Sequence, residues 1–352
     1  MSELSELVRQ RSIVVCCGSG GVGKTTVSAT FALAAAQAGR RACVVTVDPA
    51  RRLADALGVQ SLVNTPTEVD GEWSGHLYAL MLDTKGTFDA LVHRYARTPE
   101  QAEGILANRL YQNLAGALSG TQEYMAMEKL YELVDSGDFD VVVVDTPPTR
   151  NALDLLDAPR RLTRFLENRL FRALLLPTRM SLRAVGMATQ ALLRTISKVA
   201  GAEIVQDAVA FFQAFEGMEE GFRIRAGAVR EMLSNPETAF VLVTSARPDA
   251  IAEASFFAER LLERDIHPAA LVVNRIHPSF GDSTPPAGPV PEPLVALEAN
   301  LAAMRTVAVR EEQAYSSLVA QVAPAPVGRI PLFGHDVHEL TALGLAAERL
   351  FA

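Results

Sequence analysis

One short stretch, at residues 18–26, constrains the fold of this chain more than any other. It reads Gly18-Ser19-Gly20-Gly21-Val22-Gly23-Lys24-Thr25-Thr26. The apolar run at residues 12–17 before it is typical of a buried strand, and residues 27–36 after it predict a helix that Gly39 ends. The stretch is therefore predicted to form a tight loop between a strand and a helix, which is the start of an α/β fold.

The same residues fit the pattern G-x-x-x-x-G-K-[ST] of a phosphate loop. Glycines let backbone N–H groups curl around an anion, and the following helix N-terminus adds donors and a positive dipole end. Lys24 would supply charge to the β- and γ-phosphates, and the Thr25 hydroxyl would ligate Mg²⁺. A glycine-rich turn can match by chance, but the predicted strand and helix favour binding of a nucleoside triphosphate. The expected contacts come from Gly20, Gly21, Val22, Gly23, Lys24, Thr25 and Thr26.

The composition excludes several classes of protein. The 352 residues are 49% apolar and 21% charged, which suits a globular chain with a sizeable core. A net charge of −8 argues against nucleic acid or anionic lipid as a partner. No apolar run approaches the roughly 18 residues of a membrane span. The N-terminus lacks an apolar signal core, so we expect a soluble, cytoplasmic protein.

The cysteines predict neither disulfides nor a metal centre. Cys16, Cys17 and Cys43 all lie in predicted buried strands, and none has the spacing of zinc ligands. We therefore expect no zinc.

Two acidic residues follow predicted strands near the phosphate loop. Residues 41–47 form a second apolar run that ends at Asp48, and four consecutive valines at 141–144 lead to Asp145. Such runs are typical of strands buried on both faces of a parallel sheet, whose carboxyl edge carries ligands. Asp48 could simply cap the next helix. Beside a phosphate loop we favour a role on the attacking water for Asp48, and a role in holding Mg²⁺, directly or through water, for Asp145.

The remaining pattern predicts a mostly parallel twisted sheet flanked by helices, a single NTPase domain over residues 1–352. Further strands are expected at 76–82, 239–244 and 269–274, near 322–323 and at 329–333, and helices within 84–137, at 249–263, at 292–320 and from 336. Asn274 ends one strand, where its amide could read an adenine edge. Pro147 and Pro148 would form a rigid turn that senses the γ-phosphate.

Residues 158–236 carry no strand pattern and are predicted to be an inserted helical subdomain. One apolar seam comprises Val185, Ala188, Leu192, Ile196 and Val199, and another comprises Ile204, Ala208, Phe211, Phe215, Met218 and Phe222. These seams could pack on each other. Alternatively, residues 174–176, Met180, Met187 and the phenylalanines could line a groove for an apolar client, because such surfaces adapt to varied partners.

Three segments together resemble the arsenite-pump and tail-anchored-protein-targeting ATPases, a family of phosphate-loop NTPases. They are GSGGVGKTT at 18–26, TVDPARRLADALG at 46–58 and VVVVDTPPTRNALDLL at 141–156. The resemblance implies a dimeric ATPase that uses ATP and Mg²⁺ and couples nucleotide state to a helical client-binding subdomain. It implies that Asp48 orients the attacking water, that Asp145 is the switch acid and that Asn274 contacts adenine.

The chain departs from that family at several positions. Ser19 stands where the family usually has a lysine that reaches the partner subunit's ATP, and Arg150-Asn151 replaces a frequent Gly-His pair. The paired cysteines of zinc-bridged relatives and the arsenite-binding cysteines of pump members are absent. We expect an ATP-driven dimeric switch, a homodimer or a heterodimer with a related ATPase, that binds an apolar segment or partner protein. The alternatives are a poorly hydrolysing regulatory subunit, which Ser19 favours, and an arsenite-pump subunit, which the cysteines disfavour.

Overall fold

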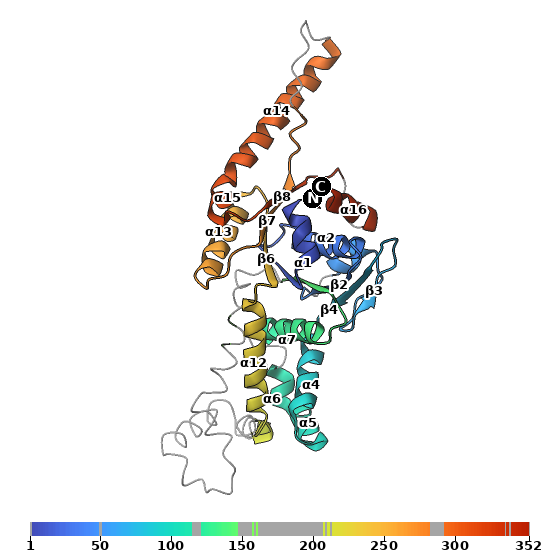
Figure 1. Ribbon diagram of the computed structural model, residues 1–352, viewed down its shortest axis with the longest axis vertical. Helices are drawn as coiled ribbons and strands as arrows, with labels where there is room; N and C mark the ends of the chain where they lie inside the picture. Colours follow the sequence, from blue (N-terminus) through green and yellow to red (C-terminus); the bar gives the residue numbers. More distant parts are fainter. Residues whose placement is uncertain are drawn as a thin grey trace. The chain divides into compact units, whose positions relative to one another are not determined.

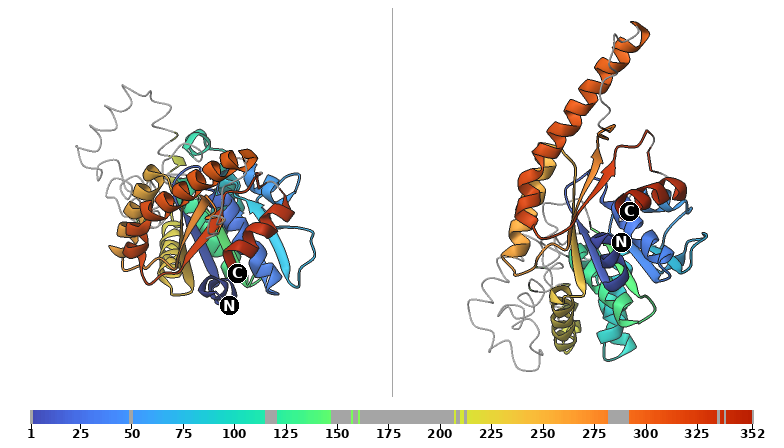
Figure 2. Two further views of the ribbon diagram at one scale, coloured as in Figure 1. Left: turned by 90° about the horizontal axis from the view of Figure 1, so that it is seen from above. Right: turned by 45° about the horizontal axis from the view of Figure 1, so that its top comes forward.

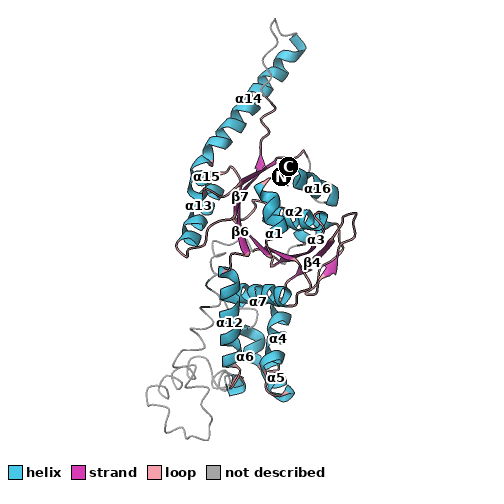
Figure 3. Ribbon diagram, in the orientation of Figure 1, coloured by secondary structure: helices cyan, strands magenta, loops and turns pink. Residues whose placement is uncertain are grey.

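The apolar runs of the sequence form one eight-stranded sheet in the computed structural model (Figures 1 and 3). The strand order is β3-β4-β2-β5-β1-β6-β7-β8, and every pairing is parallel except β3 with β4. The strands are β1 (Ile13–Cys17), β2 (Arg41–Thr46), β3 (Thr67–Glu68), β4 (His76–Met81), β5 (Val141–Asp145), β6 (Thr238–Thr244), β7 (Ala270–Ile276) and β8 (Val327–Pro331). The predicted α/β class with a mostly parallel sheet is thus confirmed.

The structure describes residues 2–48, 51–114, 121–146, 213–281 and 292–351 except 335 and 338, together with residues 157, 160, 207, 210 and 211. The chain divides into two compact units. The sheet unit comprises Met1–Met81, Leu133–Leu153 and Pro236–Ala352, and the helical unit comprises Leu82–Glu132 and Asp154–Asn235. Most of the predicted insert at 158–236 lies outside the described residues, so its extent stays a prediction.

Helices cover both faces of the sheet within the sheet unit (Figures 1 and 2). On one face lie α1 (Glu3–Gln10), α2 (Lys24–Gln37), α3 (Arg52–Leu57) and α16 (Leu340–Phe351); α13 (Pro248–Leu262) and α15 (Ser316–Val322) lie on the other. The helix α2 packs on β1, β2, β4 and β5 because its alanines let it approach the sheet closely. Its Phe31 ring meets Phe351 edge-on, with centroids 5.1 Å apart. The phosphate-loop helix is therefore enclosed by the sheet and α16.

The C-terminal third differs in detail from the sequence prediction. The helix expected at 292–320 is broken at Tyr315 into α14 (Glu292–Ala314) and α15. The prediction of a strand near residues 322–323 was wrong. Leu318 and Val322 are four residues apart, which is a helical spacing, and both are buried in α15. The helix α1 and the strand β3 were not predicted. In α1 the signal was present, since Ser2 caps a run whose Leu4, Leu7 and Val8 are buried.

The helical unit contains α4 (Thr84–Tyr95), α5 (Pro99–Leu106), α6 (Arg109–Leu114), most of α7 (Thr121–Asp135), and α12 (Glu219–Ser234). Aromatic rings fill its core. The ring centroids of Tyr95 and Phe215 lie 5.0 and 5.5 Å from that of Phe222. The Phe88 ring stacks on Tyr111, with centroids 5.4 Å apart. For Phe215 and Phe222 the core interpretation is therefore the right one, and they do not line an open groove. Phe211 is half-buried and also belongs to this cluster, with its ring centroid 6.2 Å from that of Tyr111 and 5.0 Å from that of Phe215. Residues 174–176, Met180 and Met187 lie outside the described part.

A buried ion pair joins α7 to α12 inside the helical unit. Arg225 Nε donates to Glu128 Oε1 at 2.7 Å, and the side chains are only 9% and 1% exposed. The guanidinium also lies over the Tyr131 ring, 3.8 Å from its centroid. Burial raises the pKa of Glu128, and the Arg225 charge and hydrogen bond oppose that rise. Breaking such a pair leaves an uncompensated buried charge.

We predict that Arg225→Met lowers the unfolding free energy of the helical unit by about 3 kcal/mol, because Glu128 then stays buried without its cation. A buried carboxyl with a raised pKa favours folding at low pH, and that stability is lost as pH rises through the folded-state pKa. The loss should therefore be larger at about pH 8 than at about pH 5. Thermal unfolding of both proteins at the two pH values tests this.

The matched control is Arg223→Met, because Arg223 is an exposed arginine on the same helix, paired with Glu220. It should change stability by less than about 0.5 kcal/mol. Equal losses in the two variants, or a loss in Arg225→Met that does not vary with pH, would contradict the assignment.

Candidate nucleotide site

The phosphate loop lies between β1 and α2, as predicted, and its glycines are required by geometry. A Cβ at Gly18 would lie 2.0 Å from the Val243 carbonyl oxygen on β6. Gly23 caps α2 with a left-handed φ of 90°, and a Cβ there would lie 2.1 Å from the Asn274 amide nitrogen. Side chains at these positions would force β6 or β7 away from the loop.

Lys24 is buried at the start of α2 and its ammonium folds back onto the loop. Nζ donates to the Ser19 carbonyl oxygen at 2.9 Å, and the residue is 6% exposed. Burial lowers the pKa of Lys24, while the nearby charges of Asp145 and Asp48 act in the opposite direction. A desolvated ammonium held by a neutral carbonyl gains by meeting an anion, so Lys24 is poised for a phosphate.

Asp145 is the most tightly held group in the site. It ends β5 in register with Cys16 of β1 and Thr46 of β2, so three strands converge on it. Its Oδ2 accepts from the hydroxyls of Thr25 at 2.8 Å and Thr46 at 2.9 Å. Burial raises the pKa of Asp145 to about 6, against the lowering effect of these bonds and of Lys24.

The other oxygen of Asp145, Oδ1, is buried and has no hydrogen-bond partner among the described residues. A buried carboxylate oxygen without a partner beside a threonine hydroxyl fits the donor set of Mg²⁺, which takes one or two carboxylates, water and substrate phosphate. Among the described residues no cluster of three His, Cys, Asp or Glu side chains could hold a metal. A magnesium held jointly with a nucleotide does not need one.

Asp48 follows β2 at the same edge of the sheet. Its backbone N–H donates to Thr46 Oγ1 at 3.2 Å, and its carboxylate lies 3.5 Å from Arg52 on α3. Thr146, one residue after Asp145, donates to the Cys16 carbonyl oxygen at 2.8 Å. The predicted sensor residues Pro147 and Pro148, with Arg150, lie outside the described residues.

Asn274 reaches the loop from β7, on the other side of β1 from Asp145. Its Nδ2 donates to the Val22 carbonyl oxygen at 2.8 Å and its Oδ1 accepts from the Arg275 N–H at 2.9 Å. The amide therefore already has protein partners on both atoms, and contact with adenine stays a prediction.

One cavity of about 400 Å³ in the sheet unit brings together the loop residues Lys24, Thr25 and Thr26, the acid Asp48, and Asn274. Asp145 is not among its lining residues and reaches the site through its bond from the Thr25 hydroxyl. Ile330, Phe333 and Val337 add an apolar wall. The sequence reasoning missed Thr46, Arg52 and Arg275. Thr46 could have been found as a polar residue in a buried strand one position before the chain leaves the sheet.

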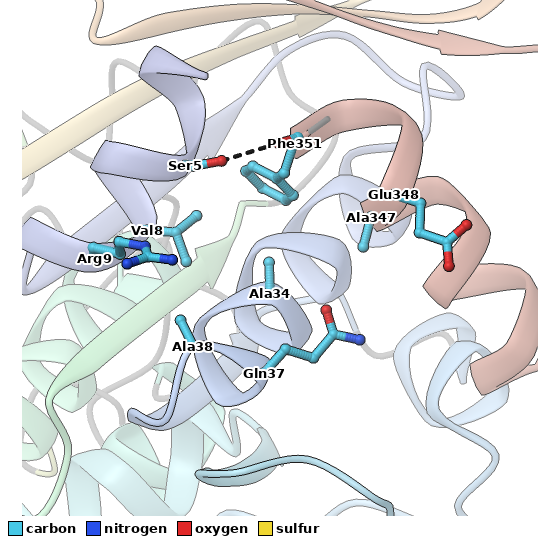
Figure 4. Close-up of a pocket in the computed structure, with 9 residues that line it drawn as sticks. All are labelled: Ser5, Val8, Arg9, Ala34, Gln37, Ala38, Ala347, Glu348 and Phe351. Carbon is cyan, nitrogen blue, oxygen red and sulfur yellow. Dashed lines mark hydrogen bonds between the residues drawn. The ribbon is translucent and has the colours of Figure 1, made fainter. Parts of the chain in front are cut away.

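A second hollow, of about 520 Å³, lies between α1, α2 and α16 (Figure 4). Its wall includes Val8, Ala34 and Phe351, and the Ser5 hydroxyl donates to the Phe351 carbonyl oxygen at 3.0 Å. Gln37, at the far end of α2, also lines it, about 20 Å along the helix from Lys24. It is larger, but it contains none of the phosphate-loop residues, so it is not the nucleotide site.

No helix in the described part of the chain is long and apolar enough to cross a membrane. Cys16, Cys17 and Cys43 are buried, and none of them forms a disulfide in the described part of the chain.

Comparison with known proteins places the chain in a family. Over 169 residues it is 31% identical to the ATPase asna-1 of Caenorhabditis elegans (45% of this chain, 48% of the relative), and over 165 residues it is 33% identical to the ATPase GET3 of Malassezia globosa (46% and 47%). It is 28% identical to an ATPase ASNA1 homolog of Cryptosporidium parvum over 260 residues (74% and 63%). The chain spans about half the length of the first two relatives. Residues 11–285 match the model of the anion-transporting ATPases, well over half of the 352 residues, and the chain belongs to that family.

Proposed function

We propose that this protein binds ATP with Mg²⁺ and hydrolyses it as a nucleotide-dependent switch. The observation that carries the proposal is the buried Asp145 carboxylate, whose Oδ2 accepts from the Thr25 hydroxyl and whose Oδ1 has no partner among the described residues; Thr25 directly follows the desolvated Lys24. Mg²⁺ would be held by Thr25 and Asp145, and its chemistry when bound is to neutralise charge on the β- and γ-phosphates. The loop amides and Lys24 bind the phosphates, and Asp48 orients water.

We infer further that nucleotide state controls an apolar client or a partner protein. Asp48 and Asp145 each lie within a segment that the family resemblance assigns to a switch, residues 46–58 and 141–156. A bound nucleotide, with its attacking water oriented by Asp48 and its Mg²⁺ held by Asp145, would bias both segments. The helical unit would bind the client, as the resemblance implies, and the active form would be a dimer in the cytoplasm.

A regulatory subunit with weak hydrolysis is the alternative that one observation favours. Ser19 is 8% exposed, and its Oγ is buried without a hydrogen-bond partner among the described residues. Because a serine is short and uncharged, this position supplies no cation that could act beyond its own loop. In that case a related ATPase with a lysine at the equivalent position would complete the active pair. Native mass spectrometry of the two proteins mixed distinguishes a heterodimer from a homodimer.

We predict that Lys24→Ala weakens ATP binding by about 100-fold, because the main phosphate cation is lost. Since Lys24 is desolvated and its ammonium donates to a neutral carbonyl, its removal should not lower the melting temperature of the nucleotide-free protein. Titration calorimetry and thermal unfolding give the two values. Lys85→Ala, at an exposed lysine of α4, is the control and should bind ATP normally. Unchanged affinity in Lys24→Ala would contradict the site.

We predict that Asp48→Asn binds ATP within about 3-fold of the unmodified protein but hydrolyses it at least about 100-fold more slowly, because an amide cannot polarise the attacking water. Steady-state phosphate release at saturating ATP measures this. Asp138→Asn, at an exposed acid outside the cavity, should keep full turnover. Full turnover in Asp48→Asn would remove Asp48 from its assigned role.

We predict that the Asp48→Asn protein captures an apolar helical segment of about 20 residues, fused to a soluble carrier, more strongly with ATP than with ADP. Co-elution on size exclusion measures the capture, and a carrier whose segment has charged residues inserted is the control. Equal capture in both nucleotide states would exclude a nucleotide-controlled client site, while leaving ATP binding intact.

A further inference from the structure

The end of β7 carries a local distortion at the edge of the nucleotide cavity. Arg275 has a φ of 60°, in the left-handed region that side-chain-bearing residues seldom adopt. The β7–β8 register shifts between Asn274 and Ile276, which is the signature of a bulge. Bulges beside sites re-aim a side chain, and strained backbone persists where the surroundings fix it. The distorted residue is therefore a candidate for function.

The distortion allows two consecutive residues to hold two consecutive carbonyls of the phosphate loop. Asn274 Nδ2 donates to the Val22 carbonyl oxygen at 2.8 Å, and Arg275 Nη1 donates to the Gly21 carbonyl oxygen at 3.2 Å. In an undistorted strand, successive side chains point to opposite faces of the sheet. The left-handed turn at Arg275 is what brings both side chains to the same loop.

Lys24, Arg52 and Arg275 are the cations among the described residues that line the cavity, and Arg275 combines an exposed side chain with a neutral partner. Arg52 lies 3.5 Å from the Asp48 carboxylate, and Lys24 is buried. Arg275 is exposed and bonded to the neutral Gly21 carbonyl. A guanidinium has five N–H donors in a planar fork that matches phosphate oxygens. One donor fixes Arg275 to the rim of the loop, and that bond orients the rest of the fork.

The strand order shows which part of a nucleotide Arg275 can reach. Asp145 ends β5 and Asp48 follows β2, on one side of β1, whereas β7 lies on the other side, beyond β6. The γ-phosphate and Mg²⁺ belong to the side of the acids. Arg275 thus faces the part of the nucleotide that ADP and ATP share.

We propose that Arg275 is a nucleotide-binding residue that donates to the α- or β-phosphate from the β7 side of the loop. This rests on the proposed function of the site. Because the contact is the same for ADP and ATP, it contributes to affinity for both and leaves the hydrolytic step unchanged.

The test is the affinity of Arg275→Ala, Arg275→Lys and Arg275→Gln for ADP and for ATP, by titration calorimetry with the full chain. We expect Arg275→Ala to weaken both by about 10-fold or more, by the same factor, with KM raised and kcat unchanged. Arg275→Lys should recover part of the loss, because it keeps the charge without the fork. Arg275→Gln should stay as weak as Arg275→Ala, because its amide can hold the Gly21 carbonyl but supplies no charge.

Arg264→Ala is the matched control, because Arg264 also donates Nη1 to a backbone carbonyl, that of Arg260 at 3.0 Å, but lies outside the cavity. It should bind both nucleotides normally. Unchanged affinity in Arg275→Ala overturns the proposal. Recovery of nucleotide affinity in Arg275→Gln also overturns it, because Arg275 would then only hold the Gly21 carbonyl and would not contact the nucleotide. If the unmodified protein binds neither nucleotide, the proposed function itself fails, and this inference fails with it.

Discussion

The site depends on one buried carboxylate, that of Asp145. Its Oδ2 accepts from Thr25 at the start of α2 and from Thr46 on β2, so a single oxygen ties together the phosphate-loop helix and two strands. Burial opposes its charge and raises its pKa to about 6, while the two hydroxyls and Lys24 support the charge. Without a bound cation, these opposing effects leave the pKa of Asp145 well above that of an ordinary aspartate. A bound metal ion would lower this pKa and favour the charged carboxylate.

The order of strands then places different groups on the two sides of the phosphate loop. The central strand β1 delivers the glycines, β5 and β2 bring the acids to one side, and β7 brings Asn274 and Arg275 to the other. The same loop is therefore held from both flanks, by hydroxyl-to-carboxylate bonds on one and by bonds to its carbonyls on the other. Gly23 has to be glycine because the Asn274 amide occupies the place of its Cβ. The loop and β7 consequently constrain each other.

Most of the sheet and the centre of the site could be predicted from sequence because short-range rules govern them. Four consecutive valines ending in Asp145 indicate a buried parallel strand and an acid at its edge, and the fold bears both out. Thr46 and Arg275 escaped prediction because their roles come from register between distant strands and from a bulge, which one strand's pattern does not encode. The strand wrongly predicted near residue 322 shows that short-range rules can also mislead. A short apolar run fits both the 3.6-residue period of a helix and the two-residue period of a strand.

Ser19 stands where the family resemblance predicts a lysine, and its contacts explain how the loop can form with a serine there. The position serves Lys24 through its backbone carbonyl, at 2.9 Å, and any residue provides that group. The serine side chain is small and buried, so it takes no part in holding β1, α2 or Asp145. What the chain loses relative to a lysine is a long cation able to act outside its own loop. The serine therefore leaves each chain's own phosphate loop complete, and its consequence would lie in how two chains cooperate in the proposed dimer.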